Sequence, residues 1–181
     1  ASGFYHGAME AAVVDIPSDV FASQIPSLCK EFTDAERSNR YNCLHGLGHG
    51  LVGYYQDQWA PALESCGLLT DSWERSSCAG GVFMQNHVNR DPNLGHKPDF
   101  RSDDPQYPCS VVAKEWKASC YMLQGSYFIS LYSDVDLGPV ADLCRQAGEY
   151  QDLCFLGLGN NFSGMNYGRN EQIIGSCAAM G

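Results

Sequence analysis

The spacing of its cysteines constrains this chain more than any other feature of the sequence. Eight of the nine cysteines form four consecutive couples, and the separation within a couple shrinks from 14 residues in the first to 10 in the last. Couples follow one another at intervals of roughly 35 to 40 residues, a period typical of helix-pair repeats. The four couples are Cys29 and Cys43, Cys66 and Cys78, Cys109 and Cys120, and Cys144 and Cys154.

The second cysteine of each couple opens a glycine-bearing segment. Gly46 and Gly48 follow Cys43, and the later segments carry glycine at the third or fifth place after the cysteine. Those later glycines are Gly81, Gly125, Gly157 and Gly159. Glycine costs a helix about 1 kcal/mol relative to alanine. Its recurrence at one register therefore predicts close contact between neighbouring helices.

The residues ahead of these segments predict shorter partner helices that carry the first cysteine of each couple. Three candidates are residues 62–69, 111–118 and 140–147. A disulfide across such a hairpin closes a loop of about a dozen residues, worth on the order of 3 kcal/mol. Spacing alone does not prove connectivity, but pairing nearest neighbours is the one scheme in which every hairpin closes itself. The prediction is an all-α fold: a right-handed array of helix-pair repeats, or α/α solenoid, with a disulfide in each hairpin.

Both ends of the predicted array are incomplete. Residues 4–10 match the second helix of a repeat, with Phe4 in the cysteine position, but no partner helix precedes them. Cys177 matches the first cysteine of a repeat whose second helix is missing, and a free or intermolecular thiol is the alternative. We expect residues 1–181 to form a single helical-repeat domain that is an excerpt of a longer array. Residues 89–108 contain four prolines and predict an irregular loop within it.

This arrangement resembles the cysteine-rich Sel1-like repeat proteins, in which a disulfide joins the two helices of each repeat. The closest stretch has Ala-Asp-Leu-Cys at residues 141–144 and Cys-Phe-Leu-Gly-Leu-Gly at residues 154–159. From Cys29 to Cys154 the likeness lies in spacing and small residues. The gap between paired cysteines is longer than in that family and varies, and His-Gly-Leu-Gly-His-Gly is not part of its pattern. The resemblance implies an α/α array with a binding role.

Candidate metal ligands cluster near the N-terminus. His45 and His49 are four residues apart in a predicted helix, so both imidazoles lie on one face. This is a spacing by which a helix presents two ligands to one metal ion. His6 and Glu10 occupy the same two registers in the preceding helix, so all four side chains converge if the helices lie side by side. The set predicts a transition-metal site, for Zn or Cu first and for Fe next, and is poor for Ca or Mg.

Three functions are compatible with this pattern. The first is a binding protein that uses the metal site. The second is a structural or interaction subunit of an extracellular or envelope assembly, in which the histidines only fill the core. The third is a metal-dependent enzyme with Glu10 as general base. Catalysis is the less favoured, because His-Gly-Leu-Gly-His lacks the glutamate of His-Glu-x-x-His and the chain contains no nucleophile elbow or P-loop.

Two further residues near this site have ordinary interpretations. Met84 takes the register of His49 in the next helix, where we expect it to fill the core, although as a soft ligand it would favour copper. His87 and His96 are expected to be surface histidines, and the alternative for His87 is that it faces the same groove as the candidate ligands.

Charge and composition limit the partners. The net charge of −10 and a pI near 4.7 argue against nucleic acid, which needs clustered Lys and Arg. We expect a protein partner or assembly instead. The sequence contains no nucleotide-binding motif, no Cys-x-x-Cys-His site for c-type haem, and no apolar run of the roughly 18 residues that would suggest a transmembrane segment. So many cysteines without a Cys-x2-Cys zinc motif favour a periplasmic or extracellular location.

Overall fold

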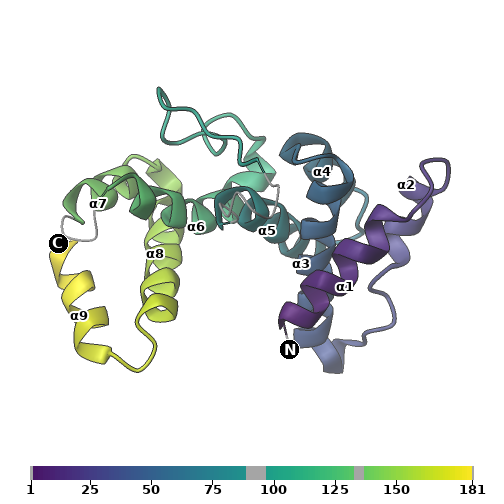
Figure 1. Ribbon diagram of the computed structural model, residues 1–181, viewed down its shortest axis with the longest axis horizontal. Helices are drawn as coiled ribbons and strands as arrows, with labels where there is room; N and C mark the ends of the chain where they lie inside the picture. Colours follow the sequence, from purple (N-terminus) through teal and green to yellow (C-terminus); the bar gives the residue numbers. More distant parts are fainter. Residues whose placement is uncertain (1, 89–96, 133–136, 181) are drawn as a thin grey trace. The chain divides into compact units, whose positions relative to one another are not determined.

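The computed structural model describes residues 2–88, 97–132 and 137–180, and these residues are predominantly helical (Figure 1). No β-strand occurs among them, and the one extended pairing is an isolated bridge between Arg101 and Asp104. The helices are α1 (Ser2–Val14), α2 (Phe21–Gln24), α3 (Arg37–Tyr54), α4 (Trp59–Cys66), α5 (Ser72–Val88), α6 (Lys114–Leu131), α7 (Gly138–Arg145), α8 (Gln151–Met165) and α9 (Asn170–Ala179). The predicted all-α class is confirmed.

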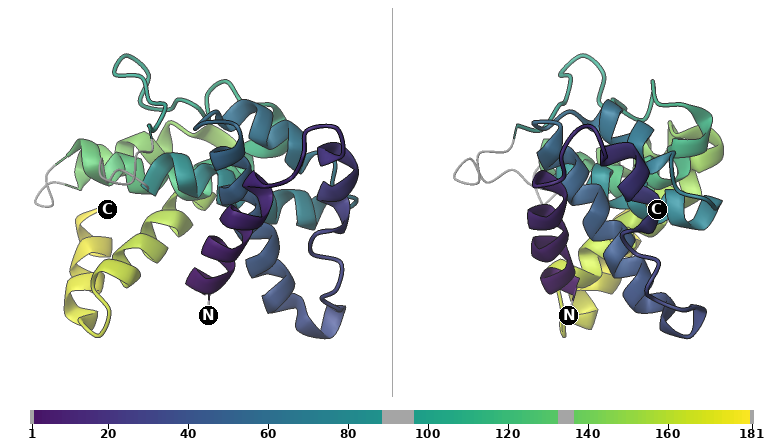
Figure 2. Two further views of the ribbon diagram at one scale, coloured as in Figure 1. Left: turned by 45° about the vertical axis from the view of Figure 1, so that its right-hand side comes forward. Right: turned by 90° about the vertical axis from the view of Figure 1, so that its right-hand side faces the viewer.

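The chain divides into two compact units, Ala1–Asp99 and Phe100–Gly181. Helices α1 to α5 belong to the first unit and α6 to α9 to the second. Within the first unit α1 packs against α3, which in turn packs against α5 (Figures 1 and 2). Within the second unit α6 packs against α8. The continuous solenoid, and the likeness to Sel1-like proteins, stay predictions.

Disulfides join the four couples that the spacing predicts, two in each unit. They are Cys29–Cys43, Cys66–Cys78, Cys109–Cys120 and Cys144–Cys154. Four disulfides indicate an oxidising, non-cytosolic compartment. Cys177 lies exposed on α9 and forms no disulfide with any described residue.

The predicted partner helices are correct for two couples and wrong for the other two. Cys66 and Cys144 lie on α4 and α7. Cys29 instead lies in a turn after a short 3-10 helix, Ile25–Ser27, and Cys109 lies in a turn directly after Pro108. Proline contributes to the difference through its position: α4 and α7 each have it in the first turn, where a helix tolerates it, whereas elsewhere it lacks the N–H that a helix needs and disfavours helical geometry in the residue before it. Pro26 stands near the first of these turns, and Pro105 and Pro108 stand before the second.

The irregular segment predicted for residues 89–108 is described only from residue 97 onward. Residues 89–96, including His96, lie outside the described residues. Residues 97–113 contain turns and an isolated bridge but no helix or strand. Within the first unit, the backbone N–H of Asp99 donates to the Asn86 side chain over 2.8 Å, and its carboxylate accepts from the Trp59 indole over 3.0 Å.

Glycine lets α3 approach both of its neighbours closely. Gly46 and Gly50 share the face toward α1, where an added Cβ on either would lie 2.7 Å from a backbone oxygen of α1. Gly48, two residues from each, lies on the opposite face, because each helical residue turns the chain by about 100°. An added Cβ at Gly48 would lie 2.1 Å from the carbonyl oxygen of Cys78 on α5. The predicted close contact at these glycines is confirmed.

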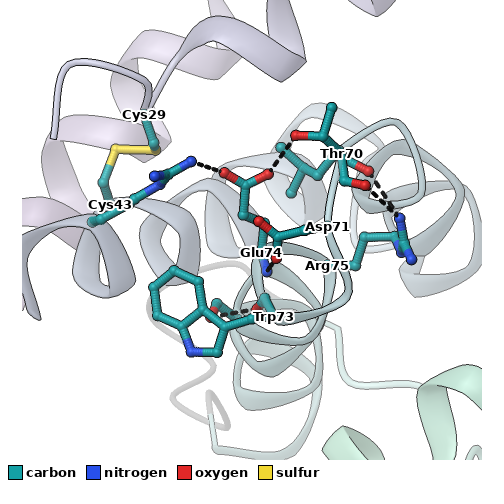
Figure 3. Close-up of polar contacts among 10 residues, drawn as sticks. Cys29, Cys43, Thr70, Asp71, Trp73, Glu74 and Arg75 are labelled. Carbon is teal, nitrogen blue, oxygen red and sulfur yellow. Dashed lines mark hydrogen bonds and ion pairs between the residues drawn. A yellow bond between two sulfur atoms is a disulfide. The ribbon is translucent and has the colours of Figure 1, made fainter. Parts of the chain in front are cut away.

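A partly buried ion pair also joins α3 to α5. The guanidinium of Arg40 on α3 contacts the carboxylate of Glu74, whose side chain is only 6% exposed. The second carboxylate oxygen of Glu74 accepts a hydrogen bond from the Thr70 hydroxyl over 3.0 Å. Figure 3 shows Glu74 lying between Thr70 and the part of α3 that carries the Cys29–Cys43 disulfide. Pairing and hydrogen bonding together compensate for removing this charge from water.

In the second unit too, a glycine allows two helices to approach closely. An added Cβ at Gly157 on α8 would lie 1.8 Å from the carbonyl oxygen of Met122 on α6. Around this contact the buried side chains of α6, α7 and α8 form one cluster, which includes Phe128, Val140 and Leu158. Among the described residues, no helix is both long and apolar enough to cross a membrane.

Candidate metal centre

Three histidines converge between α1 and α3. His6 lies on α1, and His45 and His49 lie one turn apart on α3. Each offers one ring nitrogen, and the three nitrogens all lie within 4.8 Å of one another. The ring centroids are 4.4 Å apart for His6 and His49, 5.2 Å for His6 and His45, and 5.1 Å for His45 and His49.

The glycines of α3 explain how the three rings meet. Gly46 and Gly50 each directly follow a histidine and bring the backbone of α1 against α3. His45 and His49, one position earlier in each turn, then stand at the edge of this contact. His6 reaches them from α1, because Tyr5, its chain neighbour, is the residue whose carbonyl faces Gly46. The motif His-Gly-Leu-Gly-His-Gly thus supplies two imidazoles and the space in which a third approaches them.

Burial keeps the centre of this group uncharged. His45 and His49 are 5% and 6% exposed, whereas His6 is half-buried. Burial, followed by repulsion from His49 and His6, lowers the pKa of His45 to about 3. His45 is therefore neutral at physiological pH. A neutral imidazole keeps the lone pair that a metal ion needs.

A glutamine on α5 orients one of the rings. Oε1 of Gln85 lies 2.5 Å from Nδ1 of His49, and both side chains are buried. A carbonyl oxygen can only accept, so Nδ1 of His49 carries the proton and Nε2 has the lone pair. Metal-binding histidines commonly have such a partner on their other nitrogen, which fixes both tautomer and ring orientation.

The surroundings of His45 are different. Nε2 of His45 lies 3.4 Å from Sδ of Met84 on α5, and the Tyr41 ring stacks against the imidazole at 5.5 Å between centroids. Nδ1 of His45 is buried without a hydrogen bond of normal geometry to any described residue, although the Ser77 backbone lies nearby. Gly80 leaves room for the ring, because an added Cβ there would lie 3.3 Å from Nδ1.

The structure brings together three of the four predicted ligands. Glu10 lies half-buried on α1, one turn after His6, and is not a member of the group within 4.8 Å. Its role as a ligand stays a prediction. The prediction that His87 lies at the surface is wrong: its side chain on α5 is fully buried. Helix α5 is covered by α3 and α4, which the isolated position of this histidine in the sequence does not reveal.

Sequence reasoning missed two neighbours of the histidines. Tyr41 precedes His45 by four residues, a spacing that could have indicated the stacked ring. Gln85 carries no such signal. Its contact with His49 depends on how far α5 is shifted along α3, and the contacts of Gly48 and Gly81 set that shift.

No family model matches this chain, and neither does any curated protein or any solved structure. What the site does is therefore inferred from its own geometry. Three imidazoles, two of them buried and one oriented by an amide, can hold Zn, Cu, Fe or Ni. A hydrolytic metal site would also need an open coordination position and a base. Glu10 is the nearest candidate for such a base in the sequence.

Proposed function

We propose that this protein binds a transition-metal ion through His6, His45 and His49, and that it does so in the periplasm or outside the cell. The observation that carries the proposal is the convergence of three imidazole nitrogens, from two helices, to within 4.8 Å. Side chains have to move by only about 1 Å for these nitrogens to reach the separation of about 3.3 Å found between tetrahedral ligands 2.0 Å from a metal.

Core packing is the weaker account of this group. A buried polar atom that lacks a well-formed hydrogen bond costs up to about 1–3 kcal/mol, and Nδ1 of His45 forms no bond of normal geometry with a described residue, only an approach to the Ser77 backbone. Three neighbouring imidazoles also oppose one another's protonation, as the lowered pKa of His45 reflects. Leucine or methionine would fill the same space without these costs. A metal ion instead uses neutral imidazoles, the form in which this environment holds His45.

The frame around the site suits binding. The Cys29–Cys43 and Cys66–Cys78 disulfides and the glycine contacts hold α3 and α5 in place. Ligands fixed in this way lose little conformational freedom when the metal enters. The net charge of −10 raises the local concentration of cations. It would also suit a basic protein partner, which stays a prediction.

The test is metal stoichiometry in the folded, disulfide-intact protein. Chelator-treated protein is incubated in turn with Zn(II), Cu(II), Ni(II) and, without oxygen, Cu(I) and Fe(II), then desalted and measured by elemental analysis. We expect one ion per chain for at least one of these metals. His6→Gln, His45→Gln and His49→Gln should each weaken its binding at least tenfold.

A matched control is His87→Gln, which replaces a buried histidine of the same unit outside the group. It should retain the wild-type stoichiometry, with circular dichroism confirming that all four variants are folded. Of the ligand variants, His6→Gln is the informative one if a core substitution unfolds the chain, because His6 is only half-buried. Absence of stoichiometric binding for all five ions, or binding unchanged in the folded His6→Gln variant, would overturn the proposal.

A further inference from the structure

The side chain of Met84 is the least expected neighbour of the three histidines. It lies on α5, and its Sδ atom lies 3.4 Å from Nε2 of His45. A thioether sulfur is only a weak hydrogen-bond acceptor. Buried imidazole nitrogens usually have an oxygen partner, as Nδ1 of His49 does in Gln85. Nε2 of His45 has sulfur instead.

The separation of these two atoms matches that of two ligands on one metal. A metal bonded to nitrogen at about 2.0 Å and to sulfur at about 2.3 Å holds these atoms about 3.5 Å apart at a tetrahedral angle. The distance of 3.4 Å needs almost no adjustment. His45 therefore has two kinds of neighbour: the imidazoles of His6 and His49, with centroids 5.2 and 5.1 Å away, and the Met84 sulfur, 3.4 Å from its Nε2.

We infer that Met84 is a fourth ligand and that the centre is selective for copper, as Cu(I), over Zn(II). This inference rests on the proposed function and names its metal. Thioether sulfur is a soft ligand that selects Cu(I), whereas Zn sites in proteins use thiolate, imidazole and carboxylate. His45 and His49 are buried, so the ion would be shielded from water. The hard carboxylate of Glu10, outside the group, would then contribute little to Cu(I).

Met84→Leu tests the inference, because leucine keeps the volume and removes only the sulfur. Such swaps usually cost less than about 1.5 kcal/mol, so the variant should fold. Met122→Leu, a half-buried methionine on α6 of the other unit, is the matched control. Cu(I) affinity is measured by competition with a chromophoric chelator, without oxygen and with ascorbate as reductant, which spares the disulfides. Zn(II) affinity is measured by a parallel competition.

We expect Met84→Leu to weaken Cu(I) binding at least tenfold while Zn(II) binding changes less than threefold, and Met122→Leu to change neither. X-ray absorption of the Cu(I) protein should show a sulfur neighbour near 2.3 Å that Met84→Leu removes. If the histidine variants lose metal but Met84→Leu affects Cu(I) and Zn(II) equally, or the copper shows only nitrogen and oxygen neighbours, the methionine inference fails alone. If wild type binds no metal, the proposed function fails as well.

Discussion

Two glycines on one helix offer a direct test of how the second unit is held together. Gly157 and Gly159 lie two residues apart on α8, so their side-chain positions face opposite ways. An added Cβ at Gly157 would lie 1.8 Å from the Met122 carbonyl oxygen and 2.7 Å from its carbon, whereas one at Gly159 would have no neighbour within 4 Å. Alanine at the two positions therefore makes the same chemical change in two environments.

The magnitudes follow from these distances. Real Cβ atoms essentially never approach within 3.0 Å, so Gly157→Ala must move α6 and α8 apart by at least 3.0 − 1.8 = 1.2 Å. The obstacle is backbone, which cannot rotate away as a side chain could. Overpacking of this kind costs about 1–3 kcal/mol net, occasionally more. Gly159→Ala should instead stabilise the protein by up to about 1 kcal/mol, the helix preference of alanine over glycine.

The assay is urea unfolding followed by far-UV circular dichroism, with the disulfides intact and the slope of the transition compared between proteins. We expect the midpoint to fall for Gly157→Ala and to rise or stay unchanged for Gly159→Ala. Equal shifts for the two variants would refute the reasoning, since both share the same change in helix propensity. So would a Gly157→Ala variant as stable as the wild type, because the two helices would then not be in contact at that carbonyl.

Three other outcomes are expected. Because burial lowers the folded-state pKa of His45 to about 3 from 6.5, the unfolded chain binds the extra proton between these values. The free energy of unfolding of the metal-free protein should therefore fall as pH drops from about 6.5 toward 3, and His45 contributes at most about 1.4 kcal/mol per pH unit to this fall. Urea unfolding midpoints measured across this range should depend less on pH in the His45→Gln variant. Glu74→Gln leaves the part-buried charge of Arg40 without its carboxylate and should lower the free energy of unfolding by about 1–3 kcal/mol. Thermal unfolding measures the change, and an unchanged midpoint would contradict this expectation. Glu10→Gln should weaken Zn(II) binding if Glu10 is a ligand and leave Cu(I) affinity within threefold; a large loss of Cu(I) would contradict the soft-ligand assignment of the site.

Most of what the sequence could predict came from the spacing of residues that are close together in the chain. The four cysteine couples indicated the disulfides because a bridge within a hairpin depends on residues close together in the chain. The pair His45 and His49 was readable for the same reason, since four residues make one helical turn. His6 needed one further step, the comparison of registers between two successive helices, and the structure places it beside the pair.

Contacts between helices were harder to predict. Equal registers suggested that Glu10 would join His6, yet the group within 4.8 Å contains only histidines. Gln85 and Met84 face the histidines because the carbonyls of Cys78 and His45 fit against glycines of the opposite helix. That fit fixes the shift of α5 along α3, and nothing in either segment alone encodes it. The turn at Cys109 was missed because the cysteine rhythm was given more weight than the prolines beside it.

The glycines of α3 also limit how this centre could change over time. A slide of α3 by one residue, about 1.5 Å, would put Leu47 or His49 where Gly48 now faces the Cys78 carbonyl, and no side chain fits there. The position of α3 along α5, and with it the pairing of the histidines with residues of α5, therefore cannot shift by a single residue. A descendant of this protein could acquire a different ion preference by exchanging side chains at positions such as Met84 or Gln85. It could not do so by gradually moving one helix past another.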